Sequence, residues 1–594
     1  MEATWTDDPD IKSKTLAVAA MSGLFGFLVG LGNPSWHAFI ESSQIGAGIV
    51  GYPRENPFYI YQAKSWTVLH QAGAIVLSLG VSEKTLAYLA SGLLGMVSLQ
   101  ALALSAFCLS RNVLFSASLP AFILVTRITD FGINYKIELM GYCSYGILGM
   151  GLDLIVLSLF ALRHYRSGGV LLGLAPALHP ILGALLWLCV AAAFAWDRKN
   201  FPERLRETIQ PFLLGFSITA ASAAYHFSTL DIPKVSPEAA AKYLNAYLDN
   251  GWDFHRGPVR LFSPNFILAV LGLSIGLFAL RAFKDRENDP AVFFPRALIV
   301  PGIIGLAACL VSHLPPGAVP AIFLRIMPNR FFNMNVISLV PLLAGLMAYD
   351  RKKTGVQVNL SLMLLILFLV LWLRPPHWQT GMILTLFASF AVFAIQTSAT
   401  VGNRLMAELG GKISPAIPRW IMAAVMLVSV ASAIAGAYAT WETRKISLRN
   451  WKNDPFLAEA AGRQGILLIN NIEDRVQLLT RRPILLGILN GLPYTPEAGP
   501  AMYEILMEVY ELDLFAPPDE VRNRKTNFPL ERIKSDWEAR TPERWREIKK
   551  KYGVTDVLAY ADWKLQLPGA RYSNWGGKFP EDLTRTEYVL YRIP

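Results

Sequence analysis

The sequence predicts a polytopic α-helical membrane protein that ends in a water-soluble α/β domain. Apolar segments follow one another from residue 15 to about residue 440, whereas residues 451–594 have the composition of a soluble protein. Only 17% of the 594 residues are charged, whereas soluble chains carry about 25%. We therefore expect a transmembrane helical domain over residues 1–446 and a soluble domain over residues 447–594.

The expected membrane spans come from apolar segments close to the length of about 20 residues that crosses the hydrocarbon core. Residues 15–32 follow Lys12 and Lys14 without a small-residue cleavage site, so they are expected to form an uncleaved anchor. Residues 168–195 are long for one crossing and are divided by His179-Pro180, which favours two short helices. Ten further spans bring the total to about 13 transmembrane helices: 85–107, 113–127, 145–162, 209–226, 265–283, 296–312, 334–349, 358–373, 381–399 and 419–438.

The distribution of Lys and Arg predicts the orientation of the chain. If residues 168–195 cross twice, the short basic loops fall on the same side as the N-terminus, which is then cytoplasmic. The long loops 33–83, 128–144, 227–264 and 313–333 and the C-terminal domain then lie outside. Within the first loop, Lys64, Trp66 and His70 favour an interfacial helix over residues 66–82. In a bacterium this topology places the protein in the inner membrane.

Composition also excludes several classes of protein. The net charge of +11 is accounted for by the basic loops, and no dense basic run with interleaved aromatics indicates nucleic acid. The four cysteines lie in or beside apolar segments, so no disulfide framework is expected outside the membrane. No dinucleotide fingerprint, P-loop or cysteine pair occurs in the C-terminal region, so we expect no cofactor.

The C-terminal region alternates between the patterns of strands and helices, which is typical of an α/β domain. Thr541 before Pro542 marks the start of a helix over residues 542–552. A second helix is expected at 501–512, and strands are expected at 465–470, 483–489, 554–560 and 588–593.

Acidic residues in the expected outer loops are the candidates for a general base. Glu55 lies in the first loop within the segment 52–59 (YPRENPFY), and Glu41 precedes it. A carboxylate there can accept the proton of an acceptor hydroxyl during group transfer; the structural alternative is an ion pair of Glu55 with Arg54 or Lys64. Asp130 and Glu138 in the second loop are further catalytic candidates. Acids on separate loops would also permit a magnesium or manganese site, although no metal is expected.

Basic residues in the same loops are the candidates for binding a phosphate. Arginine holds phosphate in a bidentate fork, and histidine donates to a phosphate oxygen. The structural alternative for each is a side chain that reaches the lipid headgroups. The candidates are His179, His255, Arg256, Arg330 and Lys64.

The chain resembles bacterial members of the GT-C superfamily, the multi-spanning glycosyltransferases that use polyprenyl-phosphate-linked sugars. The architecture of essentially the whole chain carries the resemblance, together with segments 55–59 (ENPFY), 173–180 (GLAPALHP) and 327–331 (MPNRF). It implies that Glu55 is the base and that Arg330 binds the donor phosphate. The sequence departs from many members in having no paired acids in the first loop.

The expected function is transfer of a sugar from a polyprenyl-phosphate donor to a glycan, lipid or protein acceptor in cell-envelope synthesis. One alternative is a polysaccharide polymerase or ligase acting on undecaprenyl-pyrophosphate glycans, which relies on arginines rather than on a carboxylate. A transporter is another alternative, and Asp153 is the clearest charge within a span that would support it. A non-enzymatic glycan-assembly protein is the fourth reading.

Overall fold

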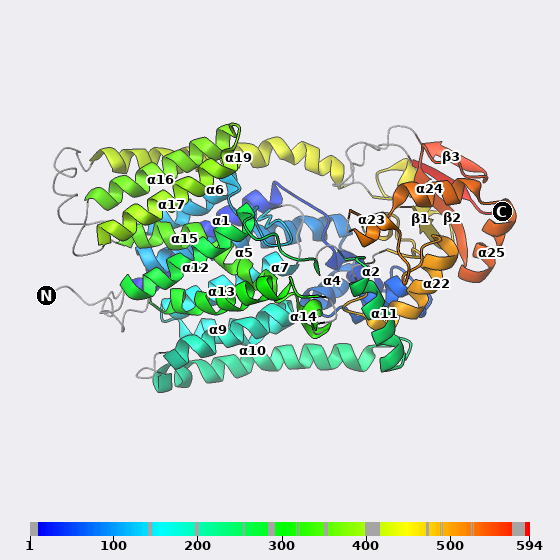
Figure 1. The fold of residues 1–594 in the computed structure, drawn as a ribbon, viewed down its shortest axis with the longest axis horizontal. Coiled ribbons are helices and arrows are strands. Elements are labelled where there is room, and N and C mark those ends of the chain that lie inside the picture. Colours follow the sequence, from blue (N-terminus) through cyan, green and yellow to red (C-terminus); the bar gives the residue numbers. More distant parts are fainter. Residues whose placement is uncertain are drawn as a thin grey trace.

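The computed structural model describes residues 10–140, 145–196, 201–253, 256–282, 292–315, 318–319, 321–349, 354–397, 416–448, 450–470, 475–487, 489, 491–523, 525–526, 528–572 and 588–594. A bundle of long helices fills one end of the molecule, and a mixed β-sheet with its own helices fills the other (Figure 1). The N-terminus lies at the far end of the bundle, and the C-terminus lies beside the sheet (Figure 1).

The bundle confirms that the chain is a polytopic helical membrane protein. Among the described residues, eight helices are long and apolar enough to cross a membrane. Shorter apolar helices also belong to the bundle. The bundle comprises α1 (Ile11–Leu31), α5 (Glu83–Ser110), α6 (Val113–Thr126), α7 (Tyr145–Ala161), α8 (Tyr165–Leu178), α9 (Pro180–Trp196), α10 (Phe201–Thr229), α12 (Pro264–Ala282), α13 (Phe293–Val311), α15 (Asn333–Tyr349), α16 (Thr354–Leu373), α17 (Trp378–Thr397) and α19 (Ala416–Ser447).

Burial within the bundle separates central helices from helices that face lipid. Helices α5 and α15 are largely enclosed by their neighbours, whereas α17 and α19 are mostly exposed. On α19, Leu427 and Tyr438 point outward, as is usual for apolar side chains in contact with acyl chains. Cys108, Cys189 and Cys309 are buried in helices of the bundle.

His179 separates two antiparallel helices, as the sequence predicts for residues 168–195. Helix α8 ends at Leu178, His179 is extended with φ −151°, and α9 begins at Pro180. The two helices run back along each other, since Trp187 Nε1 donates to the Leu172 carbonyl at 2.8 Å. The proline lacks the amide hydrogen that would continue α8, so the chain turns at this dipeptide. His179 therefore forms the tip of a helical hairpin.

Glycine lets α8 pack closely against α10. A Cβ atom on Gly173 would lie 2.3 Å from the carbonyl oxygen of Phe212, so the backbones are in direct contact. The Thr219 hydroxyl donates to the Gly173 carbonyl at 2.7 Å across the same interface. Small residues are the usual means by which helices associate in lipid, where the hydrophobic effect does not drive packing. This contact holds the hairpin against the longer helix α10.

Short helices lie between the bundle and the sheet (Figure 1). Helix α4 has 11 residues and is therefore about 16 Å long, too short to cross a bilayer. This length agrees with the interfacial helix expected over residues 66–82. The short helices are α2 (Phe39–Gly46), α3 (Pro57–Lys64), α4 (Val68–Ser78), α11 (Pro237–Asp249), α14 (Ala321–Ile326) and the 3₁₀ helix η6 (Pro328–Phe332).

The C-terminal region contains a four-stranded sheet in the order β1-β2-β4-β3. Strands β1 and β2 are parallel, and the other two pairs are antiparallel. The strands are β1 (Ile466–Ile469), β2 (Val554–Tyr560), β3 (Gly569–Tyr572) and β4 (Tyr588–Arg592). The surrounding helices are α20 (Pro455–Ala461), α21 (Val476–Thr480), η7 (Pro496–Ala498), α22 (Gly499–Val509), α23 (Asp519–Arg522), α24 (Leu530–Ala539) and α25 (Pro542–Tyr552). The strands expected at 465–470, 554–560 and 588–593 are confirmed, as are both expected helices.

The strand expected over residues 483–489 is wrong, because this segment forms only an isolated bridge between Ile484 and Leu467. At this bridge the Leu467 amide donates to the Pro483 carbonyl and the Leu485 amide donates to the Leu467 carbonyl, and other groups of the segment bond to the first loop of the chain. The Asn56 amide donates to the carbonyls of Ile484 and Leu485 at 3.0 and 3.1 Å, and the Ile484 amide donates to the Tyr52 hydroxyl. The edge of the sheet is therefore covered by residues from the bundle side.

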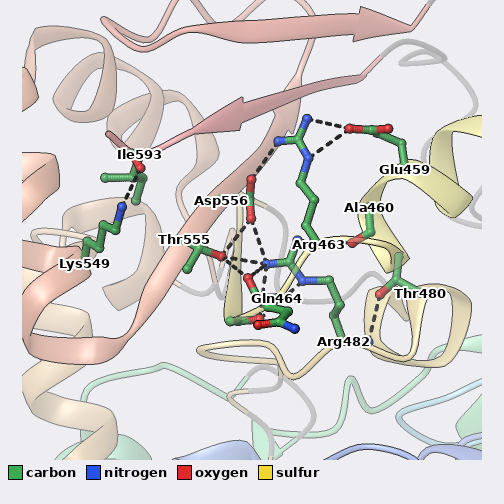
Figure 2. A network of polar contacts seen from close by, with 11 residues as sticks. Glu459, Ala460, Arg463, Gln464, Thr480, Arg482, Lys549, Thr555, Asp556 and Ile593 are labelled. Atoms are coloured by element: carbon green, nitrogen blue, oxygen red, sulfur yellow. Dashed lines mark hydrogen bonds and ion pairs between the residues drawn. The ribbon is translucent and has the colours of Figure 1, made fainter.

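A buried ionic network joins β2 to the segments beside it (Figure 2). Asp556 on β2 accepts hydrogen bonds from Arg463 at 2.7 Å and from Arg482 at 2.8 Å, and Arg482 also donates to the backbone around Gly465. Burial alone would raise the pKa of Asp556, but the bonds from Arg463 and Thr555 and the charge of Arg482 hold it below its usual value. The network is complete within itself, so we assign it to the stability of the sheet.

Candidate anion-binding site

Arg330 lies where the chain enters α15 from the side of the C-terminal region. Met327 adopts a left-handed conformation with φ 50°, and Pro328 starts the 3₁₀ helix η6, which runs directly into α15. This turn brings Arg330 over the ring of Tyr135, with 4.9 Å from the guanidinium carbon to the ring centre. Tyr135 belongs to the loop that follows α6, so two segments distant in sequence form the wall of the site.

The positive charge of Arg330 is not neutralised within the described part of the chain. Its side chain makes no hydrogen bond and no ion pair there, and its Nε is buried without an acceptor. Removing a cation from water is costly, and buried charges are normally paired or hydrogen-bonded. Arg330 is partly buried and its Nε is enclosed without an acceptor, so an anion that accepts from this side chain would bind favourably.

Arg256 contributes a second guanidinium group to the same region. It forms an ion pair with Asp253, donates from Nε to the Leu324 carbonyl at 2.8 Å and lies over the ring of Tyr494. Its Nη2 is nevertheless buried without an acceptor. The charges of Arg256 and Arg330 interact, so the two groups lie close together. Each of the two arginines therefore keeps an N–H donor that has no acceptor among the described residues.

His179 reaches this region from the tip of the α8–α9 hairpin. Its charge interacts with that of Arg330. The Leu182 amide lies 3.2 Å from Nδ1, so Nδ1 acts as the acceptor of that bond. In neutral histidine the proton then resides on Nε2, which makes Nε2 a donor. His179, Arg256 and Arg330, three of the predicted phosphate ligands, are thus brought together.

The loop that carries Asp130 is fixed to the start of α15 beside Arg330. The Ile133 amide donates to the Asn333 side chain at 2.5 Å, and the Asn333 amide donates back to the Ile133 carbonyl at 3.3 Å. Asp130 is half-buried. Burial, opposed by Arg127 and reinforced by Glu138, raises the pKa of Asp130 to about 6. Asp130 and Glu138 thus lie within electrostatic range of each other, and Asp130 can act as a base near neutral pH.

Two other predicted residues are placed differently. Glu55 is exposed and makes no hydrogen bond or ion pair with any described residue, while its neighbour Arg54 pairs with Asp231 at 2.6 Å. Lys64 forms an ion pair with Glu497 at 2.5 Å, so its charge is already neutralised. His255 lies outside the described residues. The structural alternative expected for Glu55, an ion pair with Arg54 or Lys64, is not formed either.

Sequence reasoning did not identify the aromatic and acidic partners of the arginines. Tyr135 and Tyr494 stack against Arg330 and Arg256, and Asp253 pairs with Arg256. Asp253 stands three residues before Arg256, a spacing that could have indicated the pair from the sequence. Tyr494 is more than 150 positions from either arginine, and nothing local in the sequence marks it.

Glu41 is a second candidate base whose pKa is raised by the fold. It is buried on α2, and burial raises its pKa to about 7 although Arg475 opposes the shift. Gln477 donates to the Glu41 carbonyl at 3.0 Å, so this acid lies at the junction with α21. Among the described residues, no group of three or more His, Cys, Asp or Glu side chains forms a metal-binding arrangement.

Comparison with known proteins adds no further identification. No protein-family profile matches the sequence, and no curated protein is significantly similar to it.

Proposed function

We propose that the protein is a membrane glycosyltransferase that takes its sugar from a polyprenyl-phosphate donor whose phosphate binds between Arg330 and Arg256. The observation that carries the proposal is the charge of Arg330, which is partly buried at one end of a membrane-spanning bundle and has no ion pair with any described residue. A phosphate attached to a lipid reaches such a position from the bilayer. Two arginines with open donors, and the Nε2 donor of His179, match the several oxygens of a phosphate.

The proposed reaction is a direct displacement. The acceptor hydroxyl gives its proton to Asp130, and its oxygen attacks the anomeric carbon of the sugar. The bond between that carbon and the phosphate oxygen breaks, and its electrons leave with the polyprenyl phosphate. Negative charge develops on the phosphate, where Arg330 and Arg256 stabilise it. The raised pKa of Asp130 and the attachment of its loop to Asn333 support this residue as the base in preference to Glu55.

The topology belongs to the same proposal. If the α8–α9 hairpin crosses the membrane twice, the total is the expected number of about 13 transmembrane helices. An odd number of crossings puts the two termini on opposite sides of the membrane, and they lie at opposite ends of the molecule (Figure 1). The arginine site and the C-terminal α/β domain then face outward and the N-terminus faces the cytoplasm. In a bacterium the protein would lie in the inner membrane and act in synthesis of the cell envelope.

A polysaccharide polymerase or ligase acting on undecaprenyl-pyrophosphate glycans is the second candidate. The exposure of Glu55, without a contact to either arginine, favours it, because such enzymes rely on arginines rather than on a first-loop carboxylate. The two candidates differ in the donor, which carries either one phosphate or two.

The experiment is sugar transfer by the purified protein in nanodiscs, with polyprenyl-phosphate sugars and undecaprenyl-pyrophosphate glycans as donors. Release of the free lipid phosphate and formation of product are both measured. We expect Arg330→Gln to lower kcat by about 10²-fold or more, as for loss of one preorganised charge-stabilising donor. Asp130→Asn should lower kcat by about 10²-fold or more through loss of the base.

Arg54→Gln, at an exposed arginine near the same end, serves as the matched control and should retain full activity. Full activity of Arg330→Gln would overturn the phosphate site. Turnover of the pyrophosphate donors alone, with Asp130→Asn unaffected, would replace the first candidate by the second.

A further inference from the structure

A cavity lies at the opposite end of the bundle from the arginine site. It has a volume of about 500 Å³ and lies between α6, α15, α16 and α19. Along α15, Met347 in its wall is 17 residues from Arg330, which corresponds to about 25 Å of helix. The residues that matter for its chemistry are Asn112, Phe115, Met347, Leu360, Arg419 and Met422.

The cavity lies beside the first turns of α19, a helix that is held at its start by α16 and near its end by Thr440, whose hydroxyl donates to the Asn33 side chain at 2.9 Å. The Ser361 hydroxyl donates to the Pro418 carbonyl at 2.7 Å and fixes the start of α19 against α16. The Asn112 side chain caps the N-terminus of α6 by accepting a hydrogen bond from the Phe115 backbone amide at 3.0 Å. Beyond these contacts α19 is largely exposed to the surroundings of the bundle. A space open toward lipid therefore remains between well-fixed helix ends.

The lining is divided into an apolar part and a polar part. Phe115, Met347 and Leu360 are buried and supply an apolar wall. Arg419 is exposed and makes no ion pair or hydrogen bond with any described residue. The side-chain oxygen of Asn112 accepts the hydrogen bond of the helix cap. The side-chain amide group of Asn112 has no acceptor among the described residues. A cation and an amide donor thus stand beside an apolar wall.

The surroundings indicate the depth of this polar part in the membrane. Trp420, next to Arg419, is 75% exposed, and tryptophan is enriched at the level of the lipid headgroups. The same end of the bundle carries the basic residues Lys12, Arg163, Arg166 and Arg206. Basic pockets between transmembrane helices are a typical binding site for anionic lipid headgroups.

We propose that this cavity binds one anionic phospholipid from the leaflet at the N-terminal end of the bundle. The guanidinium group of Arg419 pairs with the lipid phosphate, and the Asn112 amide donates to a headgroup oxygen. One acyl chain lies against Phe115, Met347, Leu360 and Met422.

 

Leu360 and Met422 both belong to the apolar lining, one from α16 and one from α19. A lipid held there adds a contact between the first turns of α19 and the rest of the bundle. The proposal does not depend on the proposed transferase activity, because the cavity and the arginine site lie at opposite ends of α15.

The test compares lipid binding by the full chain and by three variants. The protein is purified in detergent, and native mass spectrometry counts the bound lipid after addition of phosphatidylglycerol or phosphatidylcholine. The shift in Tm with each lipid is measured in parallel. Arg419→Gln removes the cation, Met422→Trp fills the cavity, and Arg206→Gln is the control at another exposed arginine of the same end.

We expect one retained phosphatidylglycerol in the wild-type protein and in Arg206→Gln, with a higher Tm than in phosphatidylcholine. Arg419→Gln should bind phosphatidylglycerol about tenfold more weakly, as for loss of a hydrogen bond to a charged group. Met422→Trp should lose the lipid while folding normally without it. Equal binding of both lipids by the wild-type protein, or unchanged binding in Arg419→Gln and Met422→Trp, would overturn the proposal.

Discussion

At the scale of single residues, Arg330 and Arg256 differ in how the protein compensates their charges. Arg256 has Asp253 as a buried partner, whereas Arg330 lies over the face of Tyr135 and forms no ion pair with any described residue. A buried charge without a partner lowers the stability of the folded protein until a ligand arrives. Arg330 is therefore expected to serve binding at a cost in stability, and Arg256 to serve both binding and stability.

This difference predicts opposite effects of two similar substitutions on the ligand-free protein. Arg330→Met should raise Tm by a few degrees, because it removes an uncompensated buried cation. Arg256→Met should lower Tm, because it leaves Asp253 buried without its partner. Both are measured by differential scanning fluorimetry in detergent. A fall in Tm for both variants would show that Arg330 has a stabilising partner.

The sequence indicated which basic residues lie near one another better than it indicated which acids are buried. Arg330, Arg256 and His179 stand beside prolines or aromatics at the ends of apolar segments, where polar side chains are conspicuous. Glu55 satisfies the same description, yet its side chain is exposed. Whether a loop carboxylate becomes buried depends on tertiary contacts, such as those that fix the loop of Asp130 to Asn333. Local patterns do not carry that information.

At the scale of elements, the α8–α9 hairpin holds His179 through its contact with α10. The proline at the turn was recognisable in the sequence, and the hairpin follows from it. The close approach of α8 to α10 was not recognisable in the sequence, because it depends on glycines that pack against residues about 40 positions further along the chain. The wrong strand at 483–489 has a similar origin, since its backbone partners lie in the first loop.

The hairpin contact predicts different outcomes for two glycine-to-alanine substitutions on α8. Gly173→Ala should lower Tm by a few degrees, because the new Cβ would lie 2.3 Å from the Phe212 carbonyl oxygen. Gly168→Ala is the matched control, since its Cβ would make ordinary contacts of 3.4 Å with Phe160. Alanine is the better helix former, so Gly168→Ala should leave Tm unchanged or slightly higher. Equal effects of the two substitutions would exclude close packing as the cause.

At the scale of the whole molecule, the bundle and the C-terminal region are joined by buried polar contacts. Gln44 donates to Glu83 and to the Leu478 carbonyl, and Arg481 donates to Glu83 at 2.6 Å. Gln477 donates to both Glu41 and Gln44. Polar groups at such a junction must all find partners when the two parts meet, so the junction permits one arrangement more readily than others.

Glu41 makes this junction sensitive to pH. The pKa of Glu41 is about 7 in the folded protein, above the usual value of 4.5. Between pH 4.5 and pH 7 the folded state therefore binds more protons than the unfolded state. Stability should therefore fall as the pH rises from about 4.5 to 7 and level off above. Glu41→Gln should remove this slope and raise Tm by a few degrees at pH 8, as measured over a pH series. Glu55→Gln, at an exposed acid, is the control; a slope that persists in Glu41→Gln would assign the effect to another group.

The position of β4 in the sheet has a consequence for the synthesis of the protein. Strand β4, residues Tyr588–Arg592, lies between β2 and β3 and is the last of the four strands to leave the ribosome. Until it does, β2 has a free edge and β3 has no neighbour. The helical bundle can thus be inserted in the membrane long before the sheet closes. During that interval the free edge of β2 is a natural contact for chaperones, and products truncated before residue 588 would keep it permanently.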